Sequence, residues 1–172
     1  MAAFAIRPST AADRQAILAL YVATFPKEDL SRLVAGLLWT PGVVSLVGVH
    51  DHRLAGHIAF TPCRASGGGG PVALLGPLAV APRWQGRGLG SALVRAGLAR
   101  LAEAGARAVF VLGDPDFYGR FGFSPATAVV PPYPLPAVYR DGWQCRMLGD
   151  GPRPRGTLAV PPPWRDPALW AP

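Results

Sequence analysis

The residues whose types and spacing most clearly suggest chemistry lie in the middle of the chain. In the segment Gln85-Gly-Arg-Gly-Leu-Gly90, glycines alternate with larger residues, and a helical pattern follows at once. Glycine removes side chains where a ligand must approach the backbone, and the unpaired amides of a helix's first turn attract anions. Arg83 and Arg87 add positive charge. The pattern favours a phosphate site, and the alternative is a tight glycine turn that binds nothing.

The same segment departs from two common nucleotide-binding patterns. A Walker loop requires Gly-Lys followed by Ser or Thr, whereas Gly90 is followed directly by Ser91 and no lysine lies nearby. The Rossmann fingerprint G-x-G-x-x-G is shortened to G-x-G-x-G, and the strands before it are predicted to form a hairpin instead of a βαβ unit. A nucleotide-binding protein is therefore a weaker interpretation.

The composition restricts the classes of partner. The 172 residues are 50% hydrophobic and 16% charged, which suits one folded domain over 1–172. The net charge of +7 comes from arginines scattered between Arg7 and Arg165 with no nucleic-acid-binding pattern, so we expect no nucleic acid. Cys63 and Cys145 are too few for a disulfide framework or a cysteine zinc site, and neither has a neighbouring histidine in sequence. We expect no metal and no cysteine nucleophile.

The longest uncharged stretch, residues 33–49, is interrupted by Pro41-Gly42, and a membrane span needs about 20 continuous apolar residues. The first residues lack the pattern of a secretory signal. We therefore expect a cytoplasmic protein with no membrane contact, either a monomer or a homodimer.

The elements that must position the glycine segment follow from apolar periodicity. Thr10 and Asp13 resemble a capping box at the start of a first helix. Strands are expected at residues 3–7, 43–50, 54–60, 72–80, 108–112 and 143–148. Further helices are expected at residues 27–38, 89–104 and 116–120. Eleven of the 20 prolines follow residue 130, so the tail is predicted to be extended. The order predicts an α+β fold with helices on a mixed sheet.

Two segments resemble the GNAT superfamily of N-acetyltransferases. Gln85-Gly-Arg-Gly-Leu-Gly90 is similar to its Q/R-x-x-G-x-G/A loop for the acyl-CoA pyrophosphate, and Phe117-Tyr-Gly-Arg-Phe-Gly-Phe123 resembles its Y-x-x-x-G-F segment. The sequence from Leu112 to Phe123 resembles that of a subgroup of small bacterial predicted N-acetyltransferases. The resemblance covers about residues 3–125, the expected core, and only loosely the tail at 126–172. It implies a mostly antiparallel sheet with a splayed parallel strand pair at the cofactor cleft.

The resemblance also implies roles for individual residues. Tyr118 matches the general acid, which would protonate the departing thiolate, and the Leu78 amide would polarise the acetyl carbonyl. Acetyl-CoA would be the co-substrate. The residues implied in binding it are Leu78, Ala79, Val80, Arg83, Gln85, Gly86, Arg87, Gly88, Leu89, Gly90, Ser91, Asp114, Phe117 and Tyr118.

The general base is less well marked. Many relatives place a glutamate on the strand before the loop, but residues 72–80 contain no acid. His57 and Glu28 are the base candidates, with Asp29 and a water relay as alternatives. For His57 the alternative is a hydrogen-bonded structural histidine, and for Glu28 a solvated charge near a helix start.

Together, the motifs and the resemblance predict an acetyl-CoA-dependent N-acetyltransferase. It would move an acetyl group to a primary amine by direct attack in a ternary complex. The acceptor would be a small-molecule or peptide amine. The second hypothesis is an acyl-CoA-binding module that has lost catalysis and serves as a sensor or partner domain. The tryptophans of the tail, Trp143, Trp164 and Trp170, either wall an acceptor pocket or simply pack.

Overall fold

The computed structural model describes residues 3–172, which divide into two compact units. Unit 1 contains the chain up to Phe60 together with Gly76–Gly97. Unit 2 contains Thr61–Leu75 together with Leu98–Pro172. The single domain expected over 1–172 stays a prediction.

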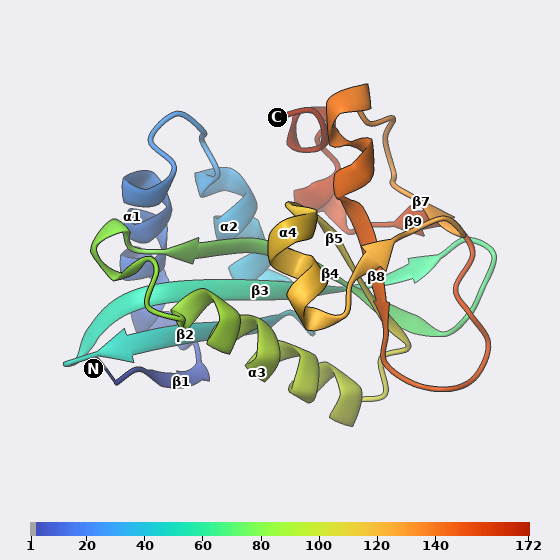
Figure 1. The fold of residues 1–172 in the computed structure, drawn as a ribbon. Coiled ribbons are helices and arrows are strands. Elements are labelled where there is room, and N and C mark those ends of the chain that lie inside the picture. The colour runs from blue at the N-terminus through green and yellow to red at the C-terminus, as the bar shows by residue number, and fades with distance from the viewer. Residues whose placement is uncertain (1–2) are drawn as a thin grey trace. The chain divides into compact units, whose positions relative to one another are not determined.

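The elements follow one another as drawn in Figure 1. The strands are β1 Ala5–Pro8, β2 Val44–His50, β3 Arg53–Ala65, β4 Pro71–Val80, β5 Ala108–Leu112, β6 Ser124–Pro125, β7 Val129–Val130, β8 Trp143–Met147 and β9 Gly156–Ala159. The α-helices are α1 Arg14–Thr24, α2 Ser31–Trp39, α3 Leu89–Glu103 and α4 Pro115–Tyr118. Short 3-10 turns η1 to η6 lie at Ala11–Asp13, Pro82–Trp84, Gly119–Phe121, Ala137–Gly142, Pro162–Trp164 and Pro167–Trp170.

Unit 1 is built on an antiparallel meander in the order β1-β2-β3-β4. The β2–β3 hairpin runs from Val44 opposite Phe60 to His50 opposite Arg53. Asp51 and His52 form its turn with φ of +46° and +62°, the left-handed values that suit a tight hairpin. In chain order β4 leads through η2 and the glycine segment into α3, so the meander positions that segment.

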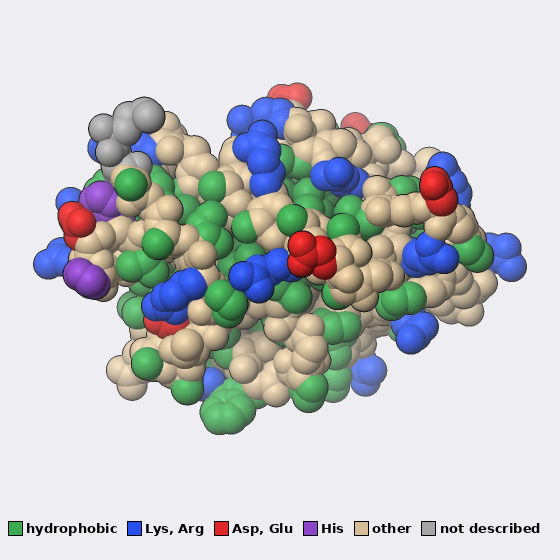
Figure 2. Space-filling model, turned by 90° about the horizontal axis from the view of Figure 1, so that it is seen from below, with side chains coloured by type: hydrophobic (Ala, Val, Ile, Leu, Met, Phe, Trp, Pro, Cys, Tyr) green, Lys and Arg blue, Asp and Glu red, His purple; other side chains and the backbone are tan. Residues whose placement is uncertain are grey.

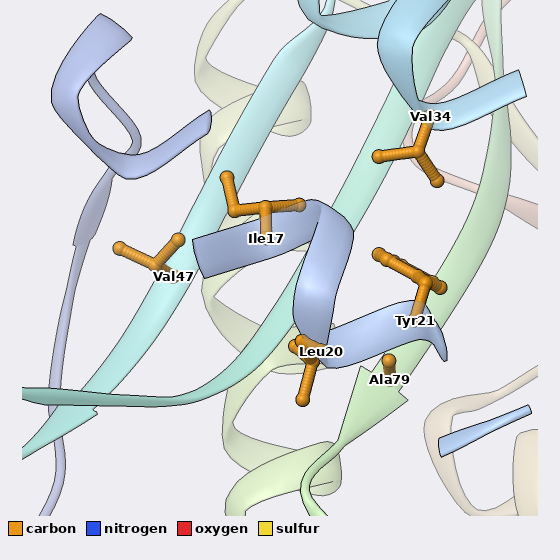
Figure 3. Packing of buried hydrophobic residues seen from close by; sticks show 6 residues of the cluster. All are labelled: Ile17, Leu20, Tyr21, Val34, Val47 and Ala79. Atoms are coloured by element: carbon orange, nitrogen blue, oxygen red, sulfur yellow. The ribbon is translucent and has the colours of Figure 1, made fainter. Parts of the chain in front are cut away.

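Helices α1 and α2 cover one face of this meander. Ile17, Leu20 and Tyr21 of α1 pack with Val34 of α2 against Val47 of β2 and Ala79 of β4 (Figure 3). All six side chains are at least nine-tenths buried. Because each fully buried aliphatic side chain contributes about 1.5–3 kcal/mol, this cluster is a main source of unit 1's stability.

Helix α3 covers the opposite face, at a place where two facing strand residues are glycines. Gly48 and Gly56 lie opposite each other across β2 and β3. The Leu89 side chain occupies the space above them, because a Cβ on Gly48 would lie 2.5 Å from Leu89 Cδ1 and one on Gly56 2.9 Å from Leu89 Cδ2. Further along α3, a Cβ on Gly97 would lie 1.9 Å from the Phe60 ring. The helix therefore lies unusually close to the strands at both points.

Unit 2 is built around the parallel pair β4–β5, from Val72 with Ala108 to Leu75 with Val111. Strand β8 pairs antiparallel with β5, and β6 pairs antiparallel with β8. Strand β9 joins β3 antiparallel and β7 parallel. Strand pairing that is mostly antiparallel, with two parallel pairs (β4–β5 and β7–β9) and flanking helices, confirms the predicted α+β fold class.

The predicted boundaries need three corrections. The second helix begins at Ser31 instead of residue 27, because residues 27–30 form turns after Pro26, with Asp29 Oδ1 accepting from the Ser31 amide. Strand β3 continues to Ala65, five residues beyond the predicted end. The proline-rich tail also holds short strands and 3-10 turns, with Trp164 and Trp170 buried.

His57 is part of a buried hydrogen-bond chain in unit 1. Its Nδ1 lies 2.8 Å from the Tyr21 hydroxyl and its Nε2 2.8 Å from Ser45 Oγ, and the Ser9 hydroxyl donates to Ser45 Oγ. The side chain is 1% exposed. Burial lowers the pKa of His57 to about 4, against a smaller raising effect from Asp13. The folded protein therefore holds a neutral imidazole at this position.

The close approach of α3 predicts the effect of Gly97→Ala. The added methyl meets the rigid Phe60 ring, so we expect the free energy of unfolding to fall by about 1–3 kcal/mol. Urea denaturation measures it. Gly119→Ala is the control, because Gly119 has φ −56° and open space around its Cβ. If Phe60→Leu costs as much in the Gly97→Ala background as it does in the unmodified protein, the steric explanation is wrong.

The neutral His57 predicts a pH dependence of stability. Its pKa is lower in the folded than in the unfolded chain, so its contribution is present above pH 6.5 and is lost as the pH falls towards 4. We expect a loss of about 3 kcal/mol over this window, from the difference in pKa. His57→Gln should remove this component from the curve of unfolding free energy against pH. Parallel curves for the two proteins would contradict the prediction. The Asp13 carboxyl, with a pKa lowered to about 2 by Arg7, titrates below this window.

Candidate active site

The glycine segment of unit 1 is an open loop that leads into α3. Gly86 and Gly88 have φ of +74° and +85°, values that side chains disfavour, and no atom lies within 4 Å of a Cβ built on either. Both residues are exposed. The loop thus presents bare backbone next to the first turn of a 15-residue helix, whose leading amides have no partner inside the helix. This arrangement attracts a polyanion such as a pyrophosphate.

Hydrogen bonds tie the loop and the residue before η2 to β4 and β3. The Gln85 side chain donates from Nε2 to the Val80 carbonyl over 3.0 Å. The Ala81 amide donates to the Ala55 carbonyl over 2.8 Å. Gln85, predicted from its motif to bind the cofactor, therefore holds the loop against the strand with its side chain.

Trp84 organises the two predicted arginines. The Arg83 and Arg87 guanidinium carbons lie 5.0 and 5.1 Å from the centre of the Trp84 ring, within cation–π range. His50, 4.5 Å away, and Phe4, 5.6 Å away, pack against the same ring. The sequence prediction missed Trp84, although its place between two arginines was a visible signal.

The end of β4 combines buried and half-buried residues. Ala79 is 1% exposed and belongs to the cluster under α1, whereas Leu78 and Val80 are half-buried. The parallel pairing with β5 ends at Leu75, and β4 continues to Val80. The roles proposed for Leu78 and Val80 use their backbone groups, so packing of their side chains is compatible with those roles.

Tyr118 lies in unit 2 at the end of α4. Its ring packs edge-to-face against Phe117 and Phe123, at 4.9 and 5.7 Å between ring centres. A Cβ on Gly113 would lie 2.3 Å from Tyr118 Cε2, so only glycine at 113 leaves room for this ring. Burial raises the pKa of the Tyr118 phenol above its usual value, which keeps the hydroxyl protonated at neutral pH.

The residues around Tyr118 hold its segment in place. Asp114 caps α4, because its Oδ1 accepts from the Asp116 amide over 2.9 Å. The buried Gln144 side chain donates to the carbonyls of Gly113 and Gly142. Asp114 thus has a structural role beside its predicted contact with cofactor. The part played by Gln144 was missed, because it comes from a strand far away in sequence.

The two base candidates both lie in unit 1. His57 has both ring nitrogens within hydrogen-bond distance of hydroxyls and is buried, which favours a structural role over proton abstraction from a substrate. Glu28 is exposed and lines a hollow of about 330 Å³ between α1 and α2, together with Asp29, Lys27 and Phe25. Carboxylates beside an open hollow can meet an amine.

The tail tryptophans pack inside unit 2. The Trp164 and Trp170 indole N–H groups donate to Thr61 Oγ1 and to the Trp164 carbonyl, and both rings are buried. Trp143 donates to the Val129 carbonyl and stacks on Phe110. Packing therefore accounts for Trp164 and Trp170, while Trp143 also lines a hollow of about 560 Å³ with residues 129–135.

Two features are absent from the described residues. No helix there is both long and apolar enough to cross a membrane. Over the same residues, His, Cys, Asp and Glu side chains nowhere gather in groups of three that could hold a metal ion. Figure 2 shows Lys and Arg side chains at many separate places on the face drawn, with few Asp and Glu.

Comparisons with known proteins agree with the motifs. The model of the Acetyltransferase (GNAT) family matches residues 14–123. The uncharacterized N-acetyltransferase YjhQ of Escherichia coli strain K12 is 36% identical over 132 residues, which cover 72% of this chain and 72% of YjhQ.

Two crystal structures share the fold. The GNAT family N-acetyltransferase YhbS from Escherichia coli, in complex with CoA, has a TM-score of 0.85 and 28% identity, and the match covers 96% of this chain and 94% of YhbS. A GNAT family acetyltransferase from Brucella melitensis, in complex with acetyl-CoA, has a TM-score of 0.77 and 31% identity, covering 95% and 99% of the two chains. With the family model matching more than half of its length, the chain belongs to the GNAT family of acetyltransferases, which makes it an acyltransferase.

Proposed function

We propose that this protein is an acetyl-CoA-dependent N-acetyltransferase that transfers the acetyl group directly to a primary amine of a small molecule or peptide. The observation that carries the proposal is the exposed loop with Gly86 and Gly88 in left-handed conformations, followed by α3 and flanked by two arginines. The complexes of YhbS with CoA and of the Brucella enzyme with acetyl-CoA support this ligand. A cytoplasmic location and the absence of nucleic-acid partners remain part of the proposal.

The loop fits the pyrophosphate of acetyl-CoA. The backbone amides from Gly86 to Ser91 would hold its oxygens, since the open space over the glycines lets a phosphate reach the main chain. Arg83 and Arg87, held on the Trp84 ring, would neutralise its charge. The backbone of Leu78 and Val80 would hold the arm that carries the thioester, with the Leu78 amide polarising the acetyl carbonyl.

Tyr118 would act as the general acid. When the amine nitrogen bonds to the acetyl carbon, the carbon–sulfur bond breaks and the departing thiolate needs a proton. The Tyr118 hydroxyl supplies it, because burial keeps the phenol protonated at neutral pH. The proton released by the attacking nitrogen restores the phenol.

The group that deprotonates the amine would lie outside strands β3 and β4. Strands β3 and β4 contain no carboxylate, and His57 is held by Tyr21 and Ser45. Glu28 or Asp29, beside the hollow at the α1–α2 connection, or a water relay would therefore take the proton from the ammonium group.

Release of free CoA separates this function from a binding module without catalysis. The purified protein is incubated with acetyl-CoA and a panel of primary amines, and released thiol is measured over time. The proposal expects thiol release that depends on one class of amine. Tight acetyl-CoA binding with no release above the hydrolysis blank for any amine would favour the binding module.

The role of Tyr118 predicts the outcome of Tyr118→Phe. Loss of the proton donor should lower kcat about 100-fold, the low end of general acid catalysis, while acetyl-CoA affinity stays within about twofold. Steady-state kinetics and calorimetry measure the two quantities. Tyr139→Phe is the matched control, since the Tyr139 hydroxyl bonds the Pro172 carbonyl in the tail. An unchanged kcat in Tyr118→Phe would remove Tyr118 from the mechanism.

Removing an arginine of the loop should weaken the binding of CoA. Arg87→Gln should raise the dissociation constant of CoA about tenfold, as expected for a charged hydrogen bond to phosphate. It should also flatten the salt dependence of binding. Arg100→Gln, on the exposed side of the same helix, changes the net charge equally and should bind CoA as the unmodified protein does. Equal effects of the two substitutions would mean that only net charge matters.

A further inference from the structure

Unit 2 contains a hollow of about 370 Å³ that the proposed reaction does not use. It is bounded by β6, β8 and residues 126–129 and 153–154, and we name it the β6–β8 hollow. The only charged side chains among the described residues lining it belong to Arg146 and Arg153, and the Ser124 and Thr127 hydroxyls lie beside them. None of its lining residues comes from the segment 78–91.

Arg146 is fixed at the edge of this hollow. Its NH1 donates to the Phe121 carbonyl over 2.9 Å, and its guanidinium lies against the bare backbone of Gly122. A guanidinium has several N–H donors, and this bond uses one nitrogen while leaving the charge in place. A fixed planar cation suits the recognition of a carboxylate or phosphate, because little freedom is lost when an anion binds.

Arg153 adds a second charge close to Cys145. Cys145 is half-buried on β8, opposite Phe110 of β5 and Ser124 of β6. Burial raises the pKa of the Cys145 thiol to about 11, and the charge of Arg153 acts in the opposite direction. The positive field of Arg153 therefore reaches the sulfur inside the hollow.

The remaining lining residues are mostly apolar in type, but the largest of them, Phe110, is buried. Val129, Met147 and Pro154 belong to the same set, and Val129 is also buried. A volume of this size lies within the range of small-molecule sites, which combine apolar walls with a few placed polar groups. The half-buried Met147 offers an apolar surface to the body of an organic molecule, and the arginines suit an acidic group on it.

We propose that the β6–β8 hollow binds a small organic anion, with its carboxylate or phosphate between Arg146 and Arg153 and its organic body beside Met147. This site does not depend on acetyl transfer. The alternative is that both arginines are ordinary surface charges of a basic protein, without any ligand.

Alkylation of Cys145 tests the anion preference without a known ligand. Iodoacetate and its neutral analogue iodoacetamide react alike: the sulfur bonds to the CH2 carbon, the carbon–iodine bond breaks and iodide leaves. The rate at Cys145 is read from its own peptide by mass spectrometry, so buried Cys63 does not interfere. The ratio of the iodoacetate rate to the iodoacetamide rate should fall about threefold in Arg153→Gln, as expected for removal of one exposed charge near the sulfur.

Arg155→Gln is the matched control, because Arg155 is exposed two residues away and does not line the hollow. It should keep the ratio of the unmodified protein. An equal ratio in all three proteins would overturn the proposal, as would an equal fall in both variants.

Protection of Cys145 then tests the ligand class. Benzoate should slow iodoacetamide labelling in the unmodified protein and lose this effect in Arg146→Gln and Arg153→Gln, whose melting temperatures report folding. Benzamide, of the same shape without the charge, should not protect. If benzamide protects as well as benzoate, the preference for an anion is wrong. If inorganic phosphate protects as well as benzoate, the proposed contact with the organic body of the ligand is wrong.

Discussion

The contact between α3 and the glycine pair Gly48–Gly56 is the constraint on which unit 1 depends. Leu89 is the first residue of α3 and lies in the space that the two absent side chains leave. Because the helix is held at its first residue, its leading amides and the glycine loop before it have one position relative to β2 and β3. The same helix is held again at Gly97 by Phe60. Close packing away from the glycine loop therefore fixes the position of the backbone proposed to hold an anion.

The charges of the loop are organised by a neutral group. Arg83 and Arg87 would repel each other in free solution, but both lie on the Trp84 ring, which His50 and Phe4 hold in turn. The electron-rich face of the indole offsets part of that repulsion before a phosphate arrives. Preorganisation of this kind lowers the entropy lost on binding. The net charge of +7 does not predict this arrangement, because the arrangement depends on where the charged side chains lie and not on their sum.

Local patterns predicted most of the fold. The Thr10–Asp13 capping box, α3 and its Gly105 end, and all five residues of β5 agree with the structure. The prediction errors lie in segments whose structure depends on contacts that are distant in sequence. Strand β9 forms by pairing with β3 and β7, and the tail is ordered because Trp164 and Trp170 donate hydrogen bonds to buried partners. No periodicity in a proline-rich segment could show either contact.

The two proposed anion sites differ in the same way. The proposed site at the glycine loop is continuous in sequence and would use backbone amides, so alternating glycines before a helix are enough to suggest it. The β6–β8 hollow is assembled from four separate stretches and uses side chains whose neighbours, such as the Phe121 carbonyl beside Arg146, are distant in the chain. Among 16 arginines, sequence alone gives no reason to choose Arg146 or Arg153. What distinguishes an arginine in this protein is the group that fixes it: an indole for Arg83 and Arg87, and a carbonyl for Arg146.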